Sequence, residues 1–406
     1  MAEFYPPLLN PSIVQMCQRI AEPLGYWQYR MTLDIEPEDL EILKALQHER
    51  VLLLPNHPTF HDWIAIFILS ARLQQSFYYL AAYERFKGLE GRLIQWLGAY
   101  SVRRGLGDRA SVQQTIDLLM QPGCHLVMFP EGGCSFQNDT VMPFRTGAVQ
   151  IALQTLNRLY KQESSLPNLY VVPVTIKYQY TSPMDLVIHR ALTRLERSLN
   201  LATAVSSDPS TFYPRLRRIG QYLLMEVEQT YGLSTSSLES QTTNERMMAV
   251  KIHILQSCEQ TLGIGAPAHL PIRERVYRLQ HHLESRAESL TAEEFWTYEA
   301  IHQAAARLLN FDAIYDGYVA AHPTPERYLD TIVRIEREVF GIGEPVPKGH
   351  RKVMIRLGAP LNLRDYFHNY QAAKILTINH LTHCLHQNVQ RNLDRLNQTL
   401  MTSRVF

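Results

Sequence analysis

The chain has 406 residues, enough for two or three domains with a large core. Its 40 basic and 39 acidic side chains leave a net charge of +1, so no overall field attracts a polyanion and we expect no nucleic-acid partner. Five scattered cysteines without a CxxC spacing argue against a disulfide framework or a structural zinc site. The apolar stretches are far shorter than the roughly 20 residues that cross a bilayer. We therefore expect a cytoplasmic protein without a transmembrane segment, which meets a membrane, if at all, peripherally at its inner face.

Short apolar runs alternate with segments of helical period between residues 29 and 180. The expected strands are 29–35, 51–54, 77–82, 100–102, 125–129 and 170–178. The expected helices between them are 40–47, 63–73, 93–97, 110–120 and 148–160. This alternation predicts an α/β domain, and the nearly continuous apolar character of the strands predicts a mostly parallel central sheet flanked by helices on both faces.

The pattern changes after Pro183, since no convincing strand appears from 191 to 341. Helical period marks 214–231, 245–262, 272–290, 293–321 and 325–340, and polar or Pro/Gly-containing breaks separate these segments. One more strand is expected at 353–357, followed by a helical tail from 371 to about 402. A lone strand after a long helical stretch indicates an insertion. We expect an α/β core over 1–189, an all-helical insertion over 190–345, and a returning strand with a C-terminal helix over 346–406.

The segment LLLPNHPTFHDWIAIF combines a strand end, a turn and a helix start. The strand ends at Leu54, His57 lies in the turn, and Thr59 can cap a helix that begins near Phe60. Ligands of open α/β sheets bind at this edge. Asp62 can reach back to the imidazole Nδ1–H, fixing the tautomer so that Nε2 accepts a proton from a reacting hydroxyl. The alternative is an ordinary turn histidine whose hydrogen bonds are satisfied by the nearby helix cap.

Two further segments offer anion sites. In CHLVMFPEGGCS, a strand leads into Glu131, Gly132 and Gly133, where glycine allows backbone N–H groups to point into a cleft. In VMPFRTGAVQIAL, Arg145 precedes a helix N-terminus, which attracts anions.

Arg103 and Arg104 follow the expected strand 100–102. If alternation continues, Arg104 shares its face with Val102, so one arginine points to the cleft and the other away. An arginine fork suits phosphate, although a solvated surface arginine is the commoner case.

These segments, in this order, resemble the motifs of the glycerophospholipid acyltransferase superfamily, the PlsC-like lysophosphatidate and glycerol-3-phosphate acyltransferases. The resemblance covers roughly 40–185 and 350–362. The matching residues are Asn56-His57 with Asp62, Gly98 with Val102 and Arg104, Phe129-Pro130-Glu131-Gly132 with Ser135, Pro143-Phe144 with Gly147, Val171 with Pro173-Val174, and Gly358 with Pro360.

The resemblance implies that His57 is the catalytic base and Asp62 its orienting carboxylate. It implies that Arg104 and the turn of Glu131, Gly132 and Gly133, together with Arg145, position the acceptor's phosphate and the acyl donor. The expected donor is acyl-carrier protein or coenzyme A bearing a fatty acyl thioester, with no other cofactor and no metal. The expected acceptor is a glycerol-type hydroxyl on a lysophospholipid such as lysophosphatidate.

One departure bears on the acceptor. Gly133-Cys134 stands where the family has Thr-Arg, so one expected phosphate-binding arginine is missing. Either Arg104 and Arg145 suffice, or the acceptor is a lipid alcohol without a phosphate monoester.

Other interpretations remain open. His57, His61 and Asp62 could bind zinc, although HPTFHD lacks the glutamate of HExxH. Cys134 could be a nucleophile in an exposed loop. The chain could also be a lipid-binding scaffold that has the fold without the chemistry. Finally, Arg215, Arg217 and Arg218 beside an apolar helix face in 214–225 suit an anionic membrane surface, or equally a core-packing helix with a solvated basic end.

Overall fold

The computed structural model describes residues 4–105, 107–163, 165–204, 206–233, 241–265, 270–286, 291–312 and 314–404. Contacts divide the chain into two units. One is an α/β unit of residues 1–103, 108–181 and 349–406, and the other is a helical unit of 104–107 and 182–348. The helical unit begins at 182 because helix α7, Asp185–Ser198, packs against helices α8 and α13 of that unit.

The α/β unit contains a mixed, mostly parallel sheet of eight strands. In chain order they are β1 Met31–Ile35, β2 Val51–Pro55, β3 Tyr78–Ala82, β4 Ala99–Val102, β5 His125–Val127, β6 Tyr170–Tyr180, β7 Arg351–Leu357 and β8 Leu361–Asn362. The spatial order is β1-β7-β6-β2-β5-β3-β4, and β8 pairs with β6. Only the β6–β7 and β6–β8 pairs in this sheet are antiparallel. The α/β fold with a mostly parallel sheet, a helical insertion and a helical tail is confirmed.

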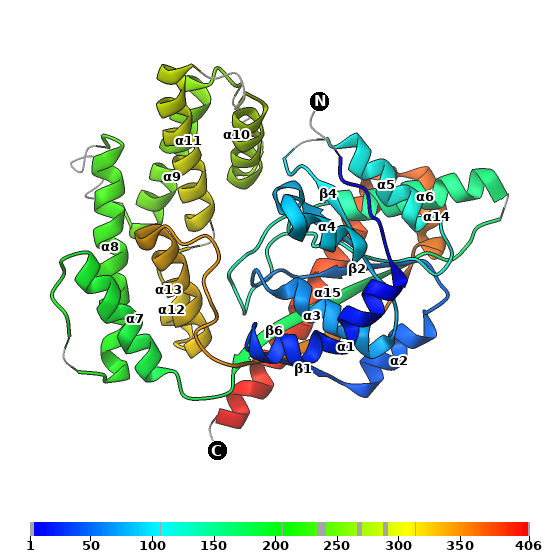
Figure 1. The fold of residues 1–406 in the computed structure, drawn as a ribbon, viewed down its shortest axis with the longest axis horizontal. Coiled ribbons are helices and arrows are strands. Elements are labelled where there is room, and N and C mark those ends of the chain that lie inside the picture. The colour runs from blue at the N-terminus through cyan, green and yellow to red at the C-terminus, as the bar shows by residue number, and fades with distance from the viewer. Residues whose placement is uncertain are drawn as a thin grey trace. The chain divides into compact units, whose positions relative to one another are not determined.

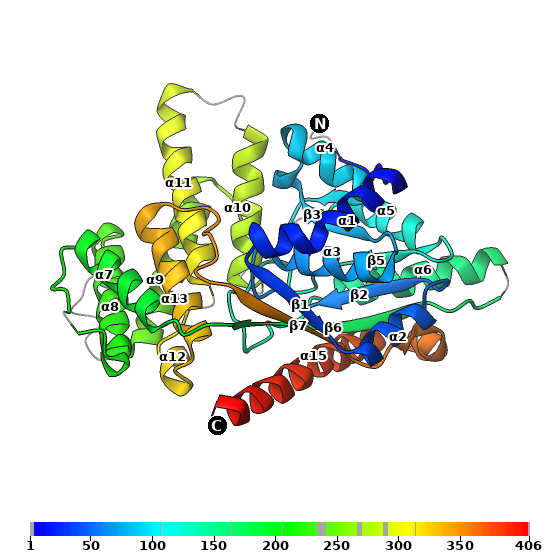
Figure 2. The same cartoon turned by 60° about the horizontal axis from the view of Figure 1, so that its bottom comes forward.

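Helices cover both faces of this sheet, as Figures 1 and 2 show. Leu53 of β2 points into one core with α1 Pro11–Trp27, α2 Pro37–Ala45 and α3 Asp62–Leu73. Its neighbour Leu52 points into a second core on the opposite face. The helices that contribute to this second core are α5 Arg109–Leu119, α6 Gly147–Glu163, α14 Phe367–Ala372 and α15 Lys374–Arg404. Burial on both faces explains why the strands read as continuous apolar runs. Helix α4, Gly88–Trp96, precedes β4.

The helical unit contains no strand among its described residues. Its helices are α7, α8 Phe212–Thr230, α9 Thr243–Thr261, α10 Ile272–Arg286, α11 Ala292–Phe311, α12 Tyr318–Ala321 and α13 Pro325–Phe340, drawn from green to orange in Figure 1. Apolar side chains of α8, α9, α10 and α11 form its core, including Leu224, Ile254, Leu279 and Leu308. Buried Arg275 pairs with Glu259 at 2.5 Å, which compensates a charge that burial would otherwise leave unpaired.

Several elements differ from expectation. The expected helix 293–321 is two helices, since α11 ends at Phe311 and α12 begins after Gly317 in a left-handed conformation with φ of 102°. Residues 287–290, the end of the expected helix 272–290, lie outside the described residues. Helices α1 and α7 and strand β8 were not expected.

The basic edge expected for 214–225 is engaged within the helical unit. Arg215 is buried and donates to Glu196 at 2.8 Å, Arg218 donates to the same carboxylate at 2.7 Å, and Arg217 pairs with Asp316 at 3.1 Å. The apolar side of this helix faces the core. Arg217 and Arg218 remain exposed while their charges are paired, so the membrane hypothesis for this helix stays a prediction.

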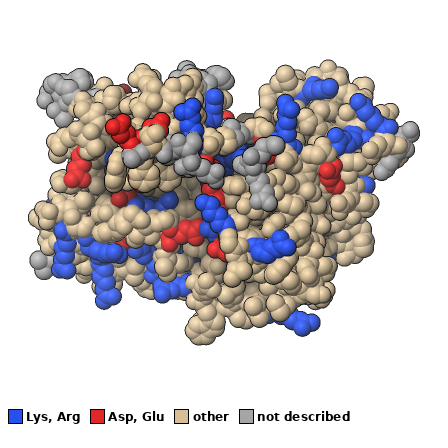
Figure 3. Space-filling view, turned by 45° about the horizontal axis from the view of Figure 1, so that its top comes forward, with Lys and Arg blue, Asp and Glu red and all other residues tan. Residues whose placement is uncertain are grey.

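On the face drawn in Figure 3, most residues carry no charge, and Lys and Arg are interspersed with Asp and Glu. No helix within the described ranges is long and apolar enough to cross a membrane.

Candidate active site

The candidate site forms where adjacent parallel strands end. Strand β2 pairs with β5 on one side and β6 on the other. Their carboxyl ends lie at the same edge of the sheet, which is where open α/β sheets bind ligands. The turn after β2 holds His57, and the turn after β5 holds Glu131, Gly132 and Gly133.

The expected contact between His57 and Asp62 is present. His57 Nδ1 lies 2.6 Å from Asp62 Oδ2, and Asp62 is the first residue of α3. The Asp62 side chain is 0% exposed, yet its carboxylate is fully satisfied. Oδ2 also accepts from the Thr59 backbone N–H at 2.9 Å, while Oδ1 accepts from Thr59 Oγ1 at 2.9 Å and from the Tyr178 hydroxyl at 2.7 Å. These donors and the positive end of the helix dipole stabilise the buried negative charge.

This contact determines how His57 presents its ring. A carboxylate accepts hydrogen bonds, so Nδ1 carries the proton and Nε2 is left as the basic nitrogen. The ring stacks on Phe129, with centroids 4.3 Å apart, and its side chain is 20% exposed. Asp62 is thus inaccessible, whereas His57 can meet a substrate.

The backbone of His57 is held on both sides. Its N–H donates to Glu131 Oε1 at 2.7 Å, and its carbonyl accepts from the Ser135 N–H at 2.7 Å. Glu131 is buried, and its Oε2 accepts from the Met142 N–H at 3.3 Å. The carboxylate expected to contact substrate therefore joins the histidine turn to the chain after β5.

Gly132 is required by both conformation and space. Its φ is +72°, and a Cβ there would lie 2.5 Å from Arg145 Cζ. The Arg145 guanidinium therefore lies against this turn, and the Arg145 N–H donates to the Pro130 carbonyl at 2.9 Å. The structure brings Glu131, Gly132 and Arg145 together beside His57, with Gly133 next in the same turn.

Arg104 is placed differently from expectation. Strand β4 ends at Val102, so strand alternation does not extend to Arg104. The Arg104 guanidinium lies 4.5 Å from the Tyr277 ring centroid and donates to the Tyr277 hydroxyl at 3.3 Å, within the helical unit. Arg103 packs over Tyr83 at 5.1 Å in the α/β unit.

Two groups next to the pair have shifted pKa values. Burial, with a contribution from Arg351, lowers the pKa of His61 from 6.5 to about 4, so this ring is neutral at pH 7. Burial and then Asp62 raise the pKa of Tyr178 well above its ordinary value, so its hydroxyl remains a donor. Across the described ranges, no three His, Cys, Asp or Glu side chains converge to hold a metal ion.

The sequence did not reveal the contacts by which neighbouring residues support the pair. Thr59 does not cap α3 as expected, because its hydroxyl instead accepts from the His61 N–H at 3.1 Å and donates to Asp62. Tyr178 lies 116 positions from Asp62, and no spacing signal connects them. Asn56 exchanges two hydrogen bonds with the Ile176 backbone, at 3.0 and 2.7 Å, and so ties the histidine turn to β6. Its position directly before His57 was the one sequence feature that indicated a role for Asn56 in this turn.

Comparison with protein families gives a match to part of the chain. Residues 35–177 match the model of the family described as Acyltransferase, and the match ends within β6, before the helical unit. It spans His57, Asp62, Glu131 and Arg145. No curated protein matches this chain.

Proposed function

We propose that the chain moves a fatty acyl group from a thioester to the hydroxyl of a glycerol-type lipid, because residues 35–177 match the family described as Acyltransferase. The family match supports acyl transfer in general, whereas donor and acceptor are part of the proposal. The observation that carries it is the 2.6 Å contact between a partly exposed His57 and a wholly buried Asp62 at the carboxyl end of β2.

The proposed reaction has one addition and one elimination. The acceptor hydroxyl oxygen attacks the thioester carbonyl carbon while His57 Nε2 takes the hydroxyl proton. Asp62 stabilises the imidazolium that forms. The tetrahedral intermediate then expels the thiolate, the C–S bond breaks, and the imidazolium returns its proton to sulfur. The products are an ester and a thiol, and the enzyme regains its starting state.

Arg145 is the residue we propose for the acceptor's phosphate. Its guanidinium lies against Gly132, in the turn that also carries Glu131 and its hydrogen bond to His57. A guanidinium there can pair with the phosphate of a lysophospholipid. With lysophosphatidate as the acceptor, the reaction would be the PlsC-like one.

A second candidate acceptor is a lipid alcohol without a phosphate monoester. Two observations favour it. Arg104 packs on Tyr277, and Gly133-Cys134 replaces the Thr-Arg of the family motif. In either case we propose that the donor is acyl-carrier protein or coenzyme A bearing the acyl group, and that the enzyme meets its lipid peripherally at the cytoplasmic face of a membrane.

An acceptor panel tests the proposal. The purified full chain would be given a labelled acyl thioester, on each carrier in turn, with lysophosphatidate, glycerol 3-phosphate, a lyso-glycolipid or a neutral long-chain alcohol. We expect labelled ester with at least one lipid acceptor. Lipid binding without transfer to any acceptor would contradict acyl transfer and support a scaffold role.

Arg145→Ala separates the two acceptor classes. If the acceptor carries phosphate, this variant should raise its KM at least about tenfold, because a charge-assisted hydrogen bond contributes about 1.5–3 kcal/mol. Arg109→Ala, at an exposed site on α5, is the matched control and should leave KM unchanged. An unchanged KM in Arg145→Ala would remove Arg145 from the phosphate site.

A further inference from the structure

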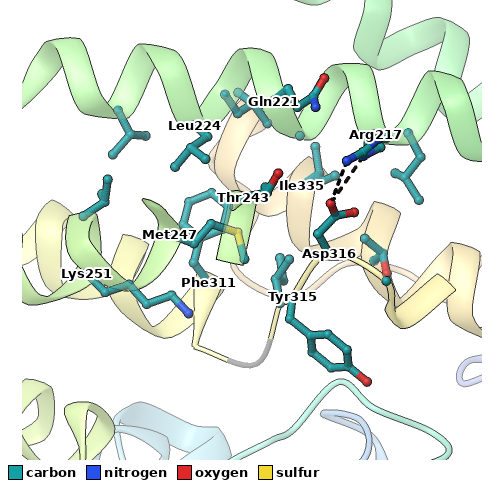
Figure 4. Close-up of a pocket in the computed structure, with 18 of the residues that line it drawn as sticks. Arg217, Gln221, Leu224, Thr243, Met247, Lys251, Phe311, Tyr315, Asp316 and Ile335 are labelled. Atoms are coloured by element: carbon teal, nitrogen blue, oxygen red, sulfur yellow. Dashed lines mark hydrogen bonds and ion pairs between the residues drawn. The ribbon is translucent and has the colours of Figure 1, made fainter. Parts of the chain in front are cut away.

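The helical unit contains an apolar cavity of about 110 Å³ that is partly open to solvent. It lies between α8, α9, α11, the segment before α12, and α13 (Figure 4). Its apolar lining includes Leu216, Leu224, Met247, Ile254, Phe311 and Ile335. The volume is somewhat below the roughly 150 Å³ of an engineered cavity that admits benzene. It therefore suits a segment of one hydrocarbon chain rather than a ring system.

Lys251 introduces one cation into this apolar lining. It comes from α9 and is 7% exposed, and Figure 4 shows its side chain reaching toward Phe311. Its ammonium can donate three hydrogen bonds, and the one it makes among the described residues goes to the Asp312 carbonyl at a long 3.4 Å. Burial lowers the pKa of Lys251 from its ordinary value, and Asp312 opposes that shift. A buried cation with so little hydrogen bonding gains from an anion beside it.

The other charged residues at the cavity have charged partners of their own. Arg217 and Asp316 lie on a different side of the cavity and pair with each other at 3.1 Å, as the dashed lines in Figure 4 show. Arg307, which also lines the cavity, pairs with Glu338 at 2.5 Å, and Asp312 beside Lys251 pairs with Arg273 at 2.7 Å. The charges within each pair balance, so the ammonium of Lys251 is the cation that a ligand would match. A monovalent carboxylate fits that charge, whereas a phosphate dianion would leave buried charge uncompensated.

We propose that this cavity binds a single-chain carboxylic acid, a free fatty acid. The carboxylate accepts a hydrogen bond from Lys251 Nζ, and part of the hydrocarbon chain lies among the apolar side chains of α8, α9 and α11. The site lies wholly in the helical unit and does not depend on acyl transfer at His57. It gives the helical region, which the family match does not cover, a ligand of its own.

Two substitutions test the cavity and the charge separately. Gly220→Leu adds a side chain on α8 at a residue that lines the cavity, and no atom lies within 4 Å of a Cβ built there. Leucine also favours helix more than glycine does, so the fold should be retained. Lys251→Met keeps a long side chain and removes the ammonium. Lys161→Met, at an exposed site on α6, is the matched control.

The readout is calorimetric binding of dodecanoate and of dodecan-1-ol to the full-length protein, with circular dichroism to verify folding. We expect the wild type and Lys161→Met to bind dodecanoate at least about tenfold more tightly than the alcohol, as a charged hydrogen bond implies. Lys251→Met should lose this preference for the acid, and Gly220→Leu should lower the affinity for both ligands at least about tenfold. His57→Ala should bind as the wild type does, which separates this site from the proposed active site.

Three results would overturn the inference. One is no dodecanoate binding by the wild type. Another is wild-type affinity for both ligands in folded Gly220→Leu, because the ligand would then bind elsewhere. The third is an undiminished preference for the acid in folded Lys251→Met. If Lys251→Met does not fold, Gly220→Leu alone decides the matter.

Discussion

Replacing Asp62 by asparagine should remove one charge from the site while leaving its geometry intact. Asp62 Oδ2 faces the Thr59 backbone N–H, which can only donate, so the amide oxygen must occupy that position. The amide NH₂ then faces Thr59 Oγ1 and the Tyr178 hydroxyl, and both can turn to accept. The amide oxygen still accepts from His57 Nδ1, so the imidazole keeps its orientation. We expect the free energy of unfolding to change by less than about 2 kcal/mol.

The rate should fall much more than the stability. When His57 takes a proton, the imidazolium and the Asp62 carboxylate are in contact, with 2.6 Å between Nδ1 and Oδ2. Two unit charges about 4 Å apart attract by about 4 kcal/mol at an effective dielectric constant of about 20. Asparagine forfeits that stabilisation in the transition state alone. At about 1.4 kcal/mol for each factor of ten, kcat should fall about 10³-fold with little change in KM.

The assay is the initial rate of labelled ester formation at saturating donor, with thermal unfolding measured on the same samples. Asp365→Asn, at an exposed position, is the matched control and should behave as the wild type. The reasoning is refuted if folded Asp62→Asn retains more than a tenth of the wild-type kcat. A large fall in melting temperature alongside the lost rate would also contradict it, since the contacts of Asp62 would then be structural rather than electrostatic.

Three further outcomes follow from the site. Glu131→Gln leaves one acceptor oxygen for two buried N–H donors, those of His57 and Met142. It should therefore lower the free energy of unfolding in urea by about 1–3 kcal/mol and also lower the rate of acyl transfer. Exposed Glu38→Gln should change neither quantity. His61 has a pKa of about 4 when folded and an ordinary value of 6.5, so the unfolded chain binds its proton first as pH falls. The contribution of His61 to the free energy of unfolding is therefore constant above pH 6.5 and falls as the pH drops from 6.5 to 4. In urea titrations we expect this contribution to lower the free energy of unfolding by about 2 kcal/mol from pH 7 to 5 in the wild type but not in His61→Phe. Cys134→Ser should retain a near-normal rate, and a rate abolished by this change would support a cysteine nucleophile instead.

Strands such as β2 and β5 were predictable because they are short, buried on both faces and bounded by turn residues. Helix α1 was missed because Pro23 and Gly25 lie within it and interrupt the usual helical signal. Packing holds it together, since Gly25 lies so close to α3 that a Cβ would be 2.7 Å from Ile68 Cδ1. Strand β8 has two residues, too few for any periodicity.

Local spacing predicted the His57–Asp62 contact but could not assign the long-range partners. The expectation for Arg104 assumed that strand geometry continued beyond Val102, where the chain in fact leaves the sheet. Glu131 has the same sequence signal whether its carboxylate points outward or inward, and only the folded chain shows that it accepts from His57 N–H. Tyr178 reaches Asp62 because β6 lies beside β2, a pairing that alternation alone does not specify.

The most direct measurement is the initial rate of acyl transfer by His57→Ala, with the best donor and acceptor from the panel. His48→Ala, a change at an exposed histidine of the same unit, is its control. We expect the rate of folded His57→Ala to be at least about 10²-fold below that of the wild type, as the loss of a general base implies. The rate of His48→Ala should match that of the wild type. A folded His57→Ala enzyme that keeps the wild-type rate would show that the imidazole at the end of β2 is not the base.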